Sequence, residues 1–64
     1  MANGTVDFFN DEKGYGFIET DDADDDVFFH VSDVPGPDPE EGDELEFVIE
    51  DGDRGPRAAN INKL

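Results

Sequence analysis

Short segments in which apolar and polar residues alternate are the feature that most constrains the fold of this 64-residue chain. Successive side chains of a β-strand point to opposite faces, so alternation predicts strands with one buried face. Stretches rich in Gly, Pro, Asn and Asp separate the segments and indicate turns. We expect strands over residues 4–10, 15–20, 27–31, 43–50 and 57–62. Closure into a barrel removes the open edges of such strands, so we predict one small all-β barrel, a single domain over residues 1–64.

The first of these segments departs from strict alternation. Val6 and Phe9 have the character of core residues, whereas Asp7 and Phe8 between them have that of exposed residues. One extra residue in a strand produces this pattern, so we expect a bulge near Phe8. The core predicted from all five strands consists of Val6, Phe9, Ile18, Val27, Phe29, Val31, Leu45, Phe47, Ile49, Ala59 and Ile61.

The apolar residues of segment 43–50 fit both the period of a helix and the period of a strand. Leu45, Val48 and Ile49 would line one face of a helix, whereas Leu45, Phe47 and Ile49 would line one face of a strand. The segment is short and rich in β-branched and aromatic residues, which favours the strand.

Two neighbouring segments carry an unusual number of rings. Residues 13–18 read Lys-Gly-Tyr-Gly-Phe-Ile, so in a strand Tyr15 and Phe17 share one face. In the next segment, Phe28 and His30 share a face in the same way. If the two strands are adjacent, four rings lie on one surface. Such a surface is a platform on which the bases of single-stranded nucleic acid stack.

A buried position is the competing interpretation of these rings, and for Tyr15, Phe17 and Phe28 taken alone the two are equally compatible with so small a protein. The order lysine, glycine, aromatic, glycine, phenylalanine, aliphatic favours the surface, because it matches the first six positions of the RNP1 signature of RNA-binding proteins. Gly14 and Gly16 leave space beside the rings and allow close approach of the backbone. Lys13 would then contact phosphate.

The charge of the chain is extreme. Nineteen Asp and Glu residues oppose four Lys and Arg residues, for a net charge of −15. Such composition can indicate disorder, but the aromatic residues and the strand pattern favour a fold. The Debye length is about 8 Å at 0.15 M salt and about 3 Å at 1 M, so self-repulsion is largely screened only at high salt. We therefore expect a halophile with a very salty cytoplasm. The four cations available for phosphate are Lys13, Arg54, Arg57 and Lys63.

Composition disfavours several other kinds of site. The chain has no cysteine and one histidine, so we expect no disulfide, no zinc site and no cofactor. Nothing resembles a signal peptide or a membrane span, and we expect a soluble, cytoplasmic protein. Residues 21–26 hold five aspartates, but they lack the glycine and glutamate of an EF-hand, so a solvated hairpin loop is favoured over a cation-binding loop. The prolines of residues 32–42 predict an irregular connection.

Several separate blocks, in order along nearly the whole chain, resemble the cold-shock domain family in its small, free-standing form. The blocks are Gly4–Val6, Phe8–Asn10, Lys13–Ile18, Asp26–His30, Gly55–Pro56 and Ala58–Ile61. The RNA-recognition-motif family shares the RNP1 pattern, but it has longer chains, two helices and its two motifs in the opposite order. The resemblance implies a five-stranded antiparallel barrel of the oligonucleotide-binding (OB) type. It also implies binding of single-stranded RNA and DNA with low sequence specificity, as an RNA chaperone or transcription antiterminator.

The resemblance also implies ligand-facing positions at seven residues, to which the charge argument adds Arg57. The predicted nucleic-acid-binding residues are Phe8, Asn10, Lys13, Tyr15, Phe17, Phe28, His30 and Arg57. Some positions depart from the family pattern: Asp7 stands where lysine is typical, and Phe8 where tryptophan is usual. Val31 replaces a frequent aromatic residue and faces either inward or toward the platform edge, and residues 35–41 contain no ring.

Two other classes of function are less well supported by the sequence. The same barrel could be an acidic protein-interaction module that mimics nucleic acid and binds a basic partner. Retention of Lys13 beside so many rings argues against it, because such a module has no use for a stacking surface. An enzyme is disfavoured, because no residue set suggests a nucleophile with its base. We expect a monomer with no small-molecule substrate and no membrane partner.

Overall fold

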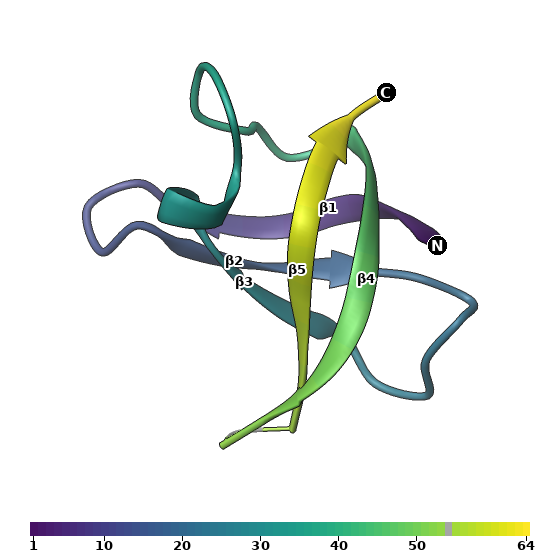
Figure 1. Ribbon diagram of the computed structural model, residues 1–64. Helices are drawn as coiled ribbons and strands as arrows, with labels where there is room; N and C mark the ends of the chain where they lie inside the picture. The colour runs from purple at the N-terminus through teal and green to yellow at the C-terminus, as the bar shows by residue number, and fades with distance from the viewer. Residues whose placement is uncertain (54) are drawn as a thin grey trace.

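The computed structural model, which describes residues 1–53 and 55–64, has five strands that close into a barrel (Figure 1). The strands are β1 (Ala2–Asn10), β2 (Tyr15–Glu19), β3 (Val27–His30), β4 (Glu44–Gly52) and β5 (Gly55–Lys63). A 3-10 helix, η1 (Val31–Asp33), follows β3. The predicted all-β barrel is confirmed, and residues 44–50 of the segment predicted at 43–50 lie in a strand. Within the described residues, no helix has the length and apolar character needed to cross a membrane.

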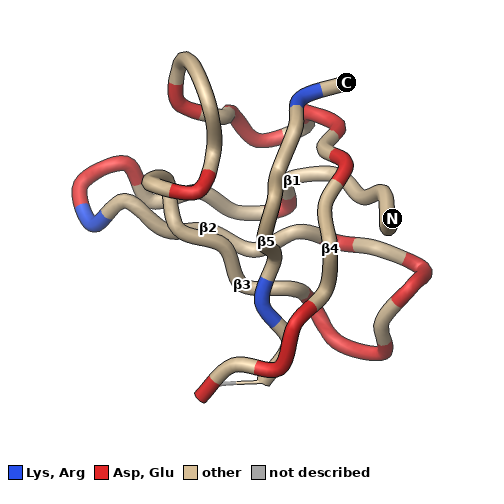
Figure 2. Tube along the Cα trace, viewed as in Figure 1, with Lys and Arg blue, Asp and Glu red and all other residues tan. Residues whose placement is uncertain are grey.

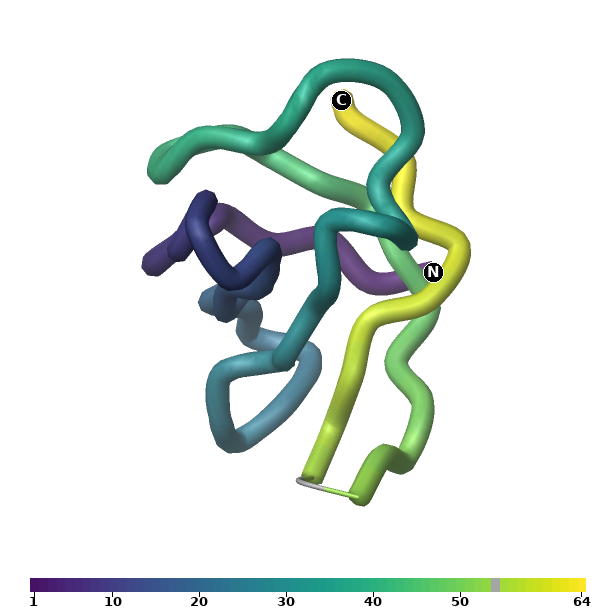
Figure 3. The backbone as a smooth tube through the Cα atoms, turned by 90° about the vertical axis from the view of Figure 1, so that its left-hand side faces the viewer, coloured from purple at the N-terminus to yellow at the C-terminus, as the bar shows by residue number. Residues whose placement is uncertain are grey.

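The strand order around the barrel is β1-β2-β3-β5-β4. Strand β1 pairs antiparallel with β2 and β4, β2 with β3, and β4 with β5. A short parallel contact between β3 and β5, at Phe28 and Arg57, completes the closure. The segment between η1 and β4 passes over one end of the barrel, near the C-terminus of the chain (Figure 3).

The predicted bulge in β1 is present. Val6 pairs with Ile18 and Phe8 pairs with Phe17, so two steps along β1 match one step along β2, and Asp7 is the extra residue. Val6 is buried and Phe8 is exposed as a result.

A second bulge, in β5, was not predicted, and the inward assignment of Ala59 is wrong. Glu46 pairs with Asn62 and Val48 with Ala59, so β5 takes three steps against two of β4. Asn60 has φ 51°, in the left-handed region that asparagine tolerates better than most residues. Because the bulge shifts the alternation, Ala58 is buried and Ala59 is half-buried.

The core agrees with most of the prediction. Its buried apolar residues are Ala2, Val6, Ile18, Val27, Phe29, Val34, Leu45, Phe47, Ala58 and Ile61, and the half-buried Phe9 and Ile49 pack against them. Val31 is a further correction: β3 ends at His30, so Val31 lies in η1 and is only half-buried. The irregular connection contributes more than expected, since Val34 and Pro39 are buried.

Candidate nucleic-acid interface

Strand pairing arranges seven of the eight predicted binding residues in two rows across the barrel. Pairing places Phe17 between Phe8 on β1 and Phe28 on β3. Tyr15 lies between Asn10 and His30 in the same way. The first row contains Phe8, Phe17, Phe28 and Arg57, and the second contains Asn10, Tyr15 and His30. The eighth residue, Lys13, lies in the turn that joins β1 to β2.

Four of these residues, Phe8, Tyr15, Phe17 and Phe28, form what we call the ring cluster. The ring centroid of Phe17 lies 6.3 Å from that of Phe8 and 5.9 Å from that of Phe28. The ring centroid of Tyr15 lies 6.2 Å from that of Phe8 and 5.8 Å from that of Phe28. Each ring of the cluster therefore has at least two aromatic neighbours. Phe8 is 41% exposed and the other three rings are half-buried. The rings therefore lie together on the surface, outside the core.

Gly16 allows the strands beneath the ring cluster to pack closely. Its side of β2 faces inward, between Phe9 of β1 and Phe29 of β3. The rings of Phe9 and Phe29 stack there, with centroids 6.0 Å apart and planes 8° from parallel. A Cβ at position 16 would lie 2.7 Å from the Phe29 ring and collide with the carbonyl oxygen of Phe8. Glycine is thus required at position 16, where the core rings of Phe9 and Phe29 stack beneath the ring cluster.

The turn that carries Lys13 is held by Asn10. The Asn10 side-chain oxygen accepts hydrogen bonds from the backbone N–H groups of Glu12 and Lys13, each at 3.1 Å. The N–H of Gly14 donates to the Asn10 carbonyl at 2.8 Å, and Gly14 has φ 74°. Asn10 therefore fixes the position of Lys13, and its amide NH2 group is the part of the side chain left to donate to a ligand.

His30 stands beside Tyr15 at the end of the second row and is exposed. Its Nδ1 lies 2.9 Å from the Ser32 hydroxyl and accepts a hydrogen bond from the Ser32 N–H at 3.1 Å. The strand ends here because His30 is the N-cap of η1. The backbone N–H of Val31 donates to the Gly14 carbonyl at 2.7 Å, and its half-buried side chain lies at the edge of the ring-bearing surface and not in the core.

Arg57 extends the first row on β5, beside Phe28. Its guanidinium donates to Asp33 of η1 at 3.3 Å, and both side chains of this ion pair are substantially exposed. Exposed pairs are worth about 0–1 kcal/mol, so a phosphate can displace Asp33 with little loss. A shallow hollow next to Phe28 is lined by Gly52, Asp53, Gly55 and Arg57.

The charges are unevenly distributed along the chain (Figure 2). Carboxylates occupy all the connections between strands that the structure describes, whereas Arg57 belongs to the first row and Lys13 lies in the turn next to the second row. Lys63 lies apart from them, near the C-terminus, and donates to the Asp38 carbonyl at 3.4 Å. Arg54, the other candidate phosphate contact, lies outside the described residues.

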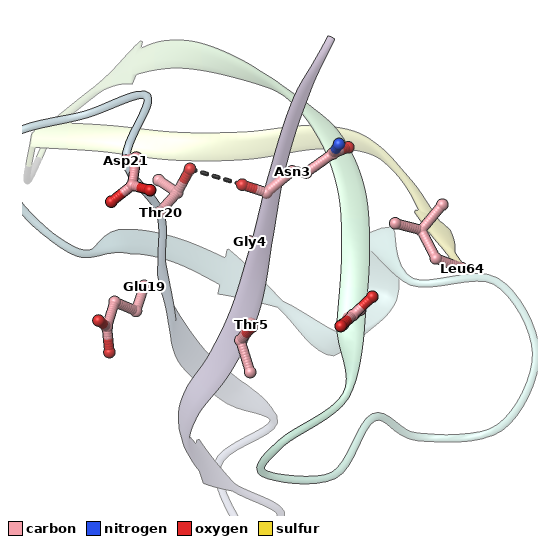
Figure 4. Close-up of a pocket in the computed structure, with 8 residues that line it drawn as sticks. Asn3, Gly4, Thr5, Glu19, Thr20, Asp21 and Leu64 are labelled. Atoms are coloured by element: carbon pink, nitrogen blue, oxygen red, sulfur yellow. Dashed lines mark hydrogen bonds between the residues drawn. The ribbon is translucent and has the colours of Figure 1, made fainter.

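A second hollow lies at the opposite end of β1 from the ring cluster, and Figure 4 shows the residues that line it. Glu19, Asp21 and Glu44 contribute carboxylates to its lining, and the Thr20 hydroxyl donates to the Asn3 carbonyl at 2.6 Å. Its negative charge would repel phosphate. Within residues 1–53 and 55–64, no group of His, Asp and Glu side chains is placed to hold a metal ion, including the aspartates of residues 21–26.

Known proteins resemble this chain over nearly its whole length. A family model described as the 'Cold-shock' DNA-binding domain matches residues 2–64. The chain is 49% identical over 67 aligned positions to both cold shock protein CspD of Bacillus subtilis and the major cold shock protein of Micrococcus luteus, covering 100% of each chain. Among solved structures, drosophila Unr CSD456 matches with a TM-score of 0.82 at 25% identity. That match covers 98% of this chain and 26% of the other.

Proposed function

The chain belongs to the cold-shock domain family, a family of nucleic-acid-binding domains, and from this premise we propose that it binds single-stranded RNA and DNA with low sequence specificity. The observation that supports this most directly is the ring cluster, whose four rings gather on one surface of β1, β2 and β3. Every base has a flat π-face, so stacking on such rings is tolerant of sequence.

Stacking supplies most of the binding free energy in this proposal. Each stacked base contributes about 1–3 kcal/mol, so three or four bases give roughly 3–12 kcal/mol. Ordering the flexible strand opposes binding and reduces this sum. Since a Kd of 1 μM corresponds to about −8 kcal/mol, we expect micromolar or weaker affinity.

The biological role that we propose is that of an RNA chaperone or transcription antiterminator, acting as a monomer in the cytoplasm. A protein that binds unpaired bases and not duplex shifts the equilibrium toward open strands by mass action. Weak, sequence-tolerant binding suits this role, because the protein must release each strand again. No hydrolysis and no cofactor are required.

Binding to a short oligo-dT is expected to be as tight or tighter in 2 M KCl than in 0.1 M KCl. Ordinary nucleic-acid binding weakens with salt because phosphate contacts release counterions. Here the net charge of −15 repels the strand, and added salt screens that repulsion while stacking persists. Tyr15 is the only tyrosine and the chain has no tryptophan, so quenching of its emission reports occupancy of the ring cluster.

The control for this titration is the same oligo-dT paired with oligo-dA in a duplex of equal length, which we expect to leave Tyr15 emission unchanged. Circular dichroism must first establish that the protein is folded at both salt concentrations. A folded protein that binds oligo-dT at neither concentration would contradict the proposal and favour a basic protein partner for the acidic surface.

We also propose that the protein is adapted to a very salty cytoplasm. Its Cα radius of gyration is 10.1 Å, comparable with the Debye length of about 8 Å at 0.15 M salt, so most of its carboxylates repel one another at ordinary salt. Thermal melts followed by circular dichroism are therefore expected to shift to higher Tm between 0.05 M and 2 M KCl. Equal melting temperatures at the two concentrations would contradict this adaptation.

A further inference from the structure

Both polar contacts of Ser32 with the His30 ring are made at one ring nitrogen, Nδ1. The backbone N–H of Ser32 donates to Nδ1 at 3.1 Å, and the Ser32 hydroxyl lies 2.9 Å from the same nitrogen. A backbone N–H is always a donor, so Nδ1 must be the acceptor. In the neutral imidazole the proton is then on Nε2, because one ring nitrogen donates and the other accepts.

The other side of the ring is open. Among the described residues, none accepts a hydrogen bond from Nε2. Gly14 is the neighbour on that side: a Cβ at its position would be in van der Waals contact with Nε2, at 3.7 Å, so glycine leaves this edge of the ring uncovered. His30 is exposed, and it lies beside Tyr15 at the end of its row.

We propose that Ser32 is a positioning residue that fixes His30 as an Nε2–H donor to an oxygen of the bound nucleic acid. The proposal rests on the nucleic-acid binding proposed above and assigns His30 a hydrogen bond in addition to stacking. No ring occurs in residues 32–42, so the platform ends at His30. A directed N–H group at this edge contacts the strand where the rings can no longer do so.

The free protein provides the first test. The chain has a single histidine, so its ring nitrogens can be assigned without ambiguity in a 15N-labelled sample. We expect a pyrrole-type Nε2, a pyridine-type Nδ1, and a scalar coupling across the hydrogen bond between the Ser32 amide nitrogen and Nδ1. A protonated Nδ1 in the neutral ring, or no coupling in a folded protein, would overturn the proposed positioning.

Binding of oligo-dT provides the second test, through His30→Phe. This variant keeps a flat ring for stacking and removes the N–H donor. Loss of one hydrogen bond is expected to weaken binding about 3- to 10-fold. Unchanged or tighter binding would mean that His30 acts by stacking alone, and would overturn the proposal.

A double-mutant cycle tests whether Ser32 acts through His30. Ser32→Ala keeps the backbone donor and removes the hydroxyl, so we expect about 2- to 4-fold weaker binding, restored by Ser32→Thr. In the His30→Phe background, Ser32→Ala should have no further effect. An equal loss in both backgrounds would show a structural effect independent of His30, and would overturn the positioning role.

Two oxygens could accept the hydrogen bond, a phosphate oxygen or a base carbonyl. An oligo-dT with methylphosphonate linkages separates them, because each linkage loses its charge and one of its two non-bridging oxygens. The wild-type advantage over His30→Phe shrinks if phosphate is the acceptor and is unchanged if a base carbonyl is. Binding by wild-type protein is measured first in each series. If wild-type protein does not bind, the proposed function itself fails, whereas binding that is insensitive to both substitutions refutes only the role of His30 and Ser32.

Discussion

Replacing Phe17 with alanine is expected to weaken oligo-dT binding by about 5- to 150-fold while the barrel stays folded. Stacking on an aromatic side chain is worth about 1–3 kcal/mol per base, and each 1.4 kcal/mol is a factor of ten in Kd. Phe17 is the central ring of its row, with centroids 6.3 Å from Phe8 and 5.9 Å from Phe28. Its removal interrupts the stacking surface in the middle, where a base would contact more than one ring.

The effect of Phe17→Ala on stability is expected to be smaller than that of a core substitution. Truncation of a buried phenylalanine costs about 3–5 kcal/mol. Phe17 is half-buried and lies outside the core cluster, so we expect a loss of roughly 1–2 kcal/mol, on the scale of the apolar area it covers. Urea unfolding and the Tyr15 titration, run in the same 2 M KCl buffer, measure both quantities.

Phe9→Ala is the matched control. Phe9 is also a half-buried phenylalanine of the same sheet, but it faces inward and stacks on Phe29 with centroids 6.0 Å apart. We expect Phe9→Ala to lower the free energy of unfolding more than Phe17→Ala, and to leave the affinity of the folded protein nearly unchanged. The platform would be refuted if Phe17→Ala were the more destabilising of the two and still bound oligo-dT normally.

The alternation of apolar and polar residues predicted the buried face of a strand where the strand is regular, or where the sequence itself shows the interruption caused by a bulge. The bulge in β1 could be predicted because Asp7 and Phe8 interrupt the apolar pattern between Val6 and Phe9. The bulge in β5 could not, because Ala58 and Ala59 are equally apolar and equally small. The positive φ of Asn60 decides which of them faces inward, and an asparagine in a strand gives only a weak indication of that conformation.

The positions of the site residues followed from side-chain alternation and strand pairing, whereas their supporting contacts did not. A two-residue period is enough to place Tyr15 and Phe17 on one face. The ion pair of Arg57 with Asp33 joins residues 24 positions apart, and no local pattern indicates it. The contact of Ser32 with His30 is local, and a serine two residues after a strand-ending histidine was a signal that could have been used.

Gly16→Ala adds one methyl group beneath the ring cluster and is expected to lower the free energy of unfolding more than any other single added methyl group there. The new Cβ would lie 2.7 Å from Cε1 and Cζ of Phe29 and would collide with the Phe8 carbonyl oxygen. Phe29 is fully buried, and the carbonyl belongs to the backbone of β1, so neither can move aside by a change of rotamer. Overpacking typically costs about 1–3 kcal/mol, and a collision with both a buried ring and the backbone places Gly16→Ala at the upper end of this range, about 3 kcal/mol.

That loss is a large part of the total stability. A domain of this length has a free energy of unfolding of roughly 3–10 kcal/mol, so the variant should be largely unfolded at low salt and measurable only in concentrated KCl. Any relief of the collision must increase the separation of β1 and β2 at the Phe9–Gly16 pair. Because Phe8 adjoins that pair, the variant molecules that do fold should also bind oligo-dT more weakly than wild-type protein does.

Gly36→Ala separates this collision from the conformational preference of glycine. Gly36 has φ 79°, but nothing lies within 4 Å of a Cβ built there, so alanine costs only the backbone strain of about 1–2 kcal/mol. Gly36 is in the irregular connection after η1, and oligo-dT binding should be retained. Urea unfolding in 2 M KCl compares the two variants. If Gly16→Ala proved no less stable than Gly36→Ala, strands β1 and β2 would have room to separate, and the rings above them would not be held by close packing at Gly16.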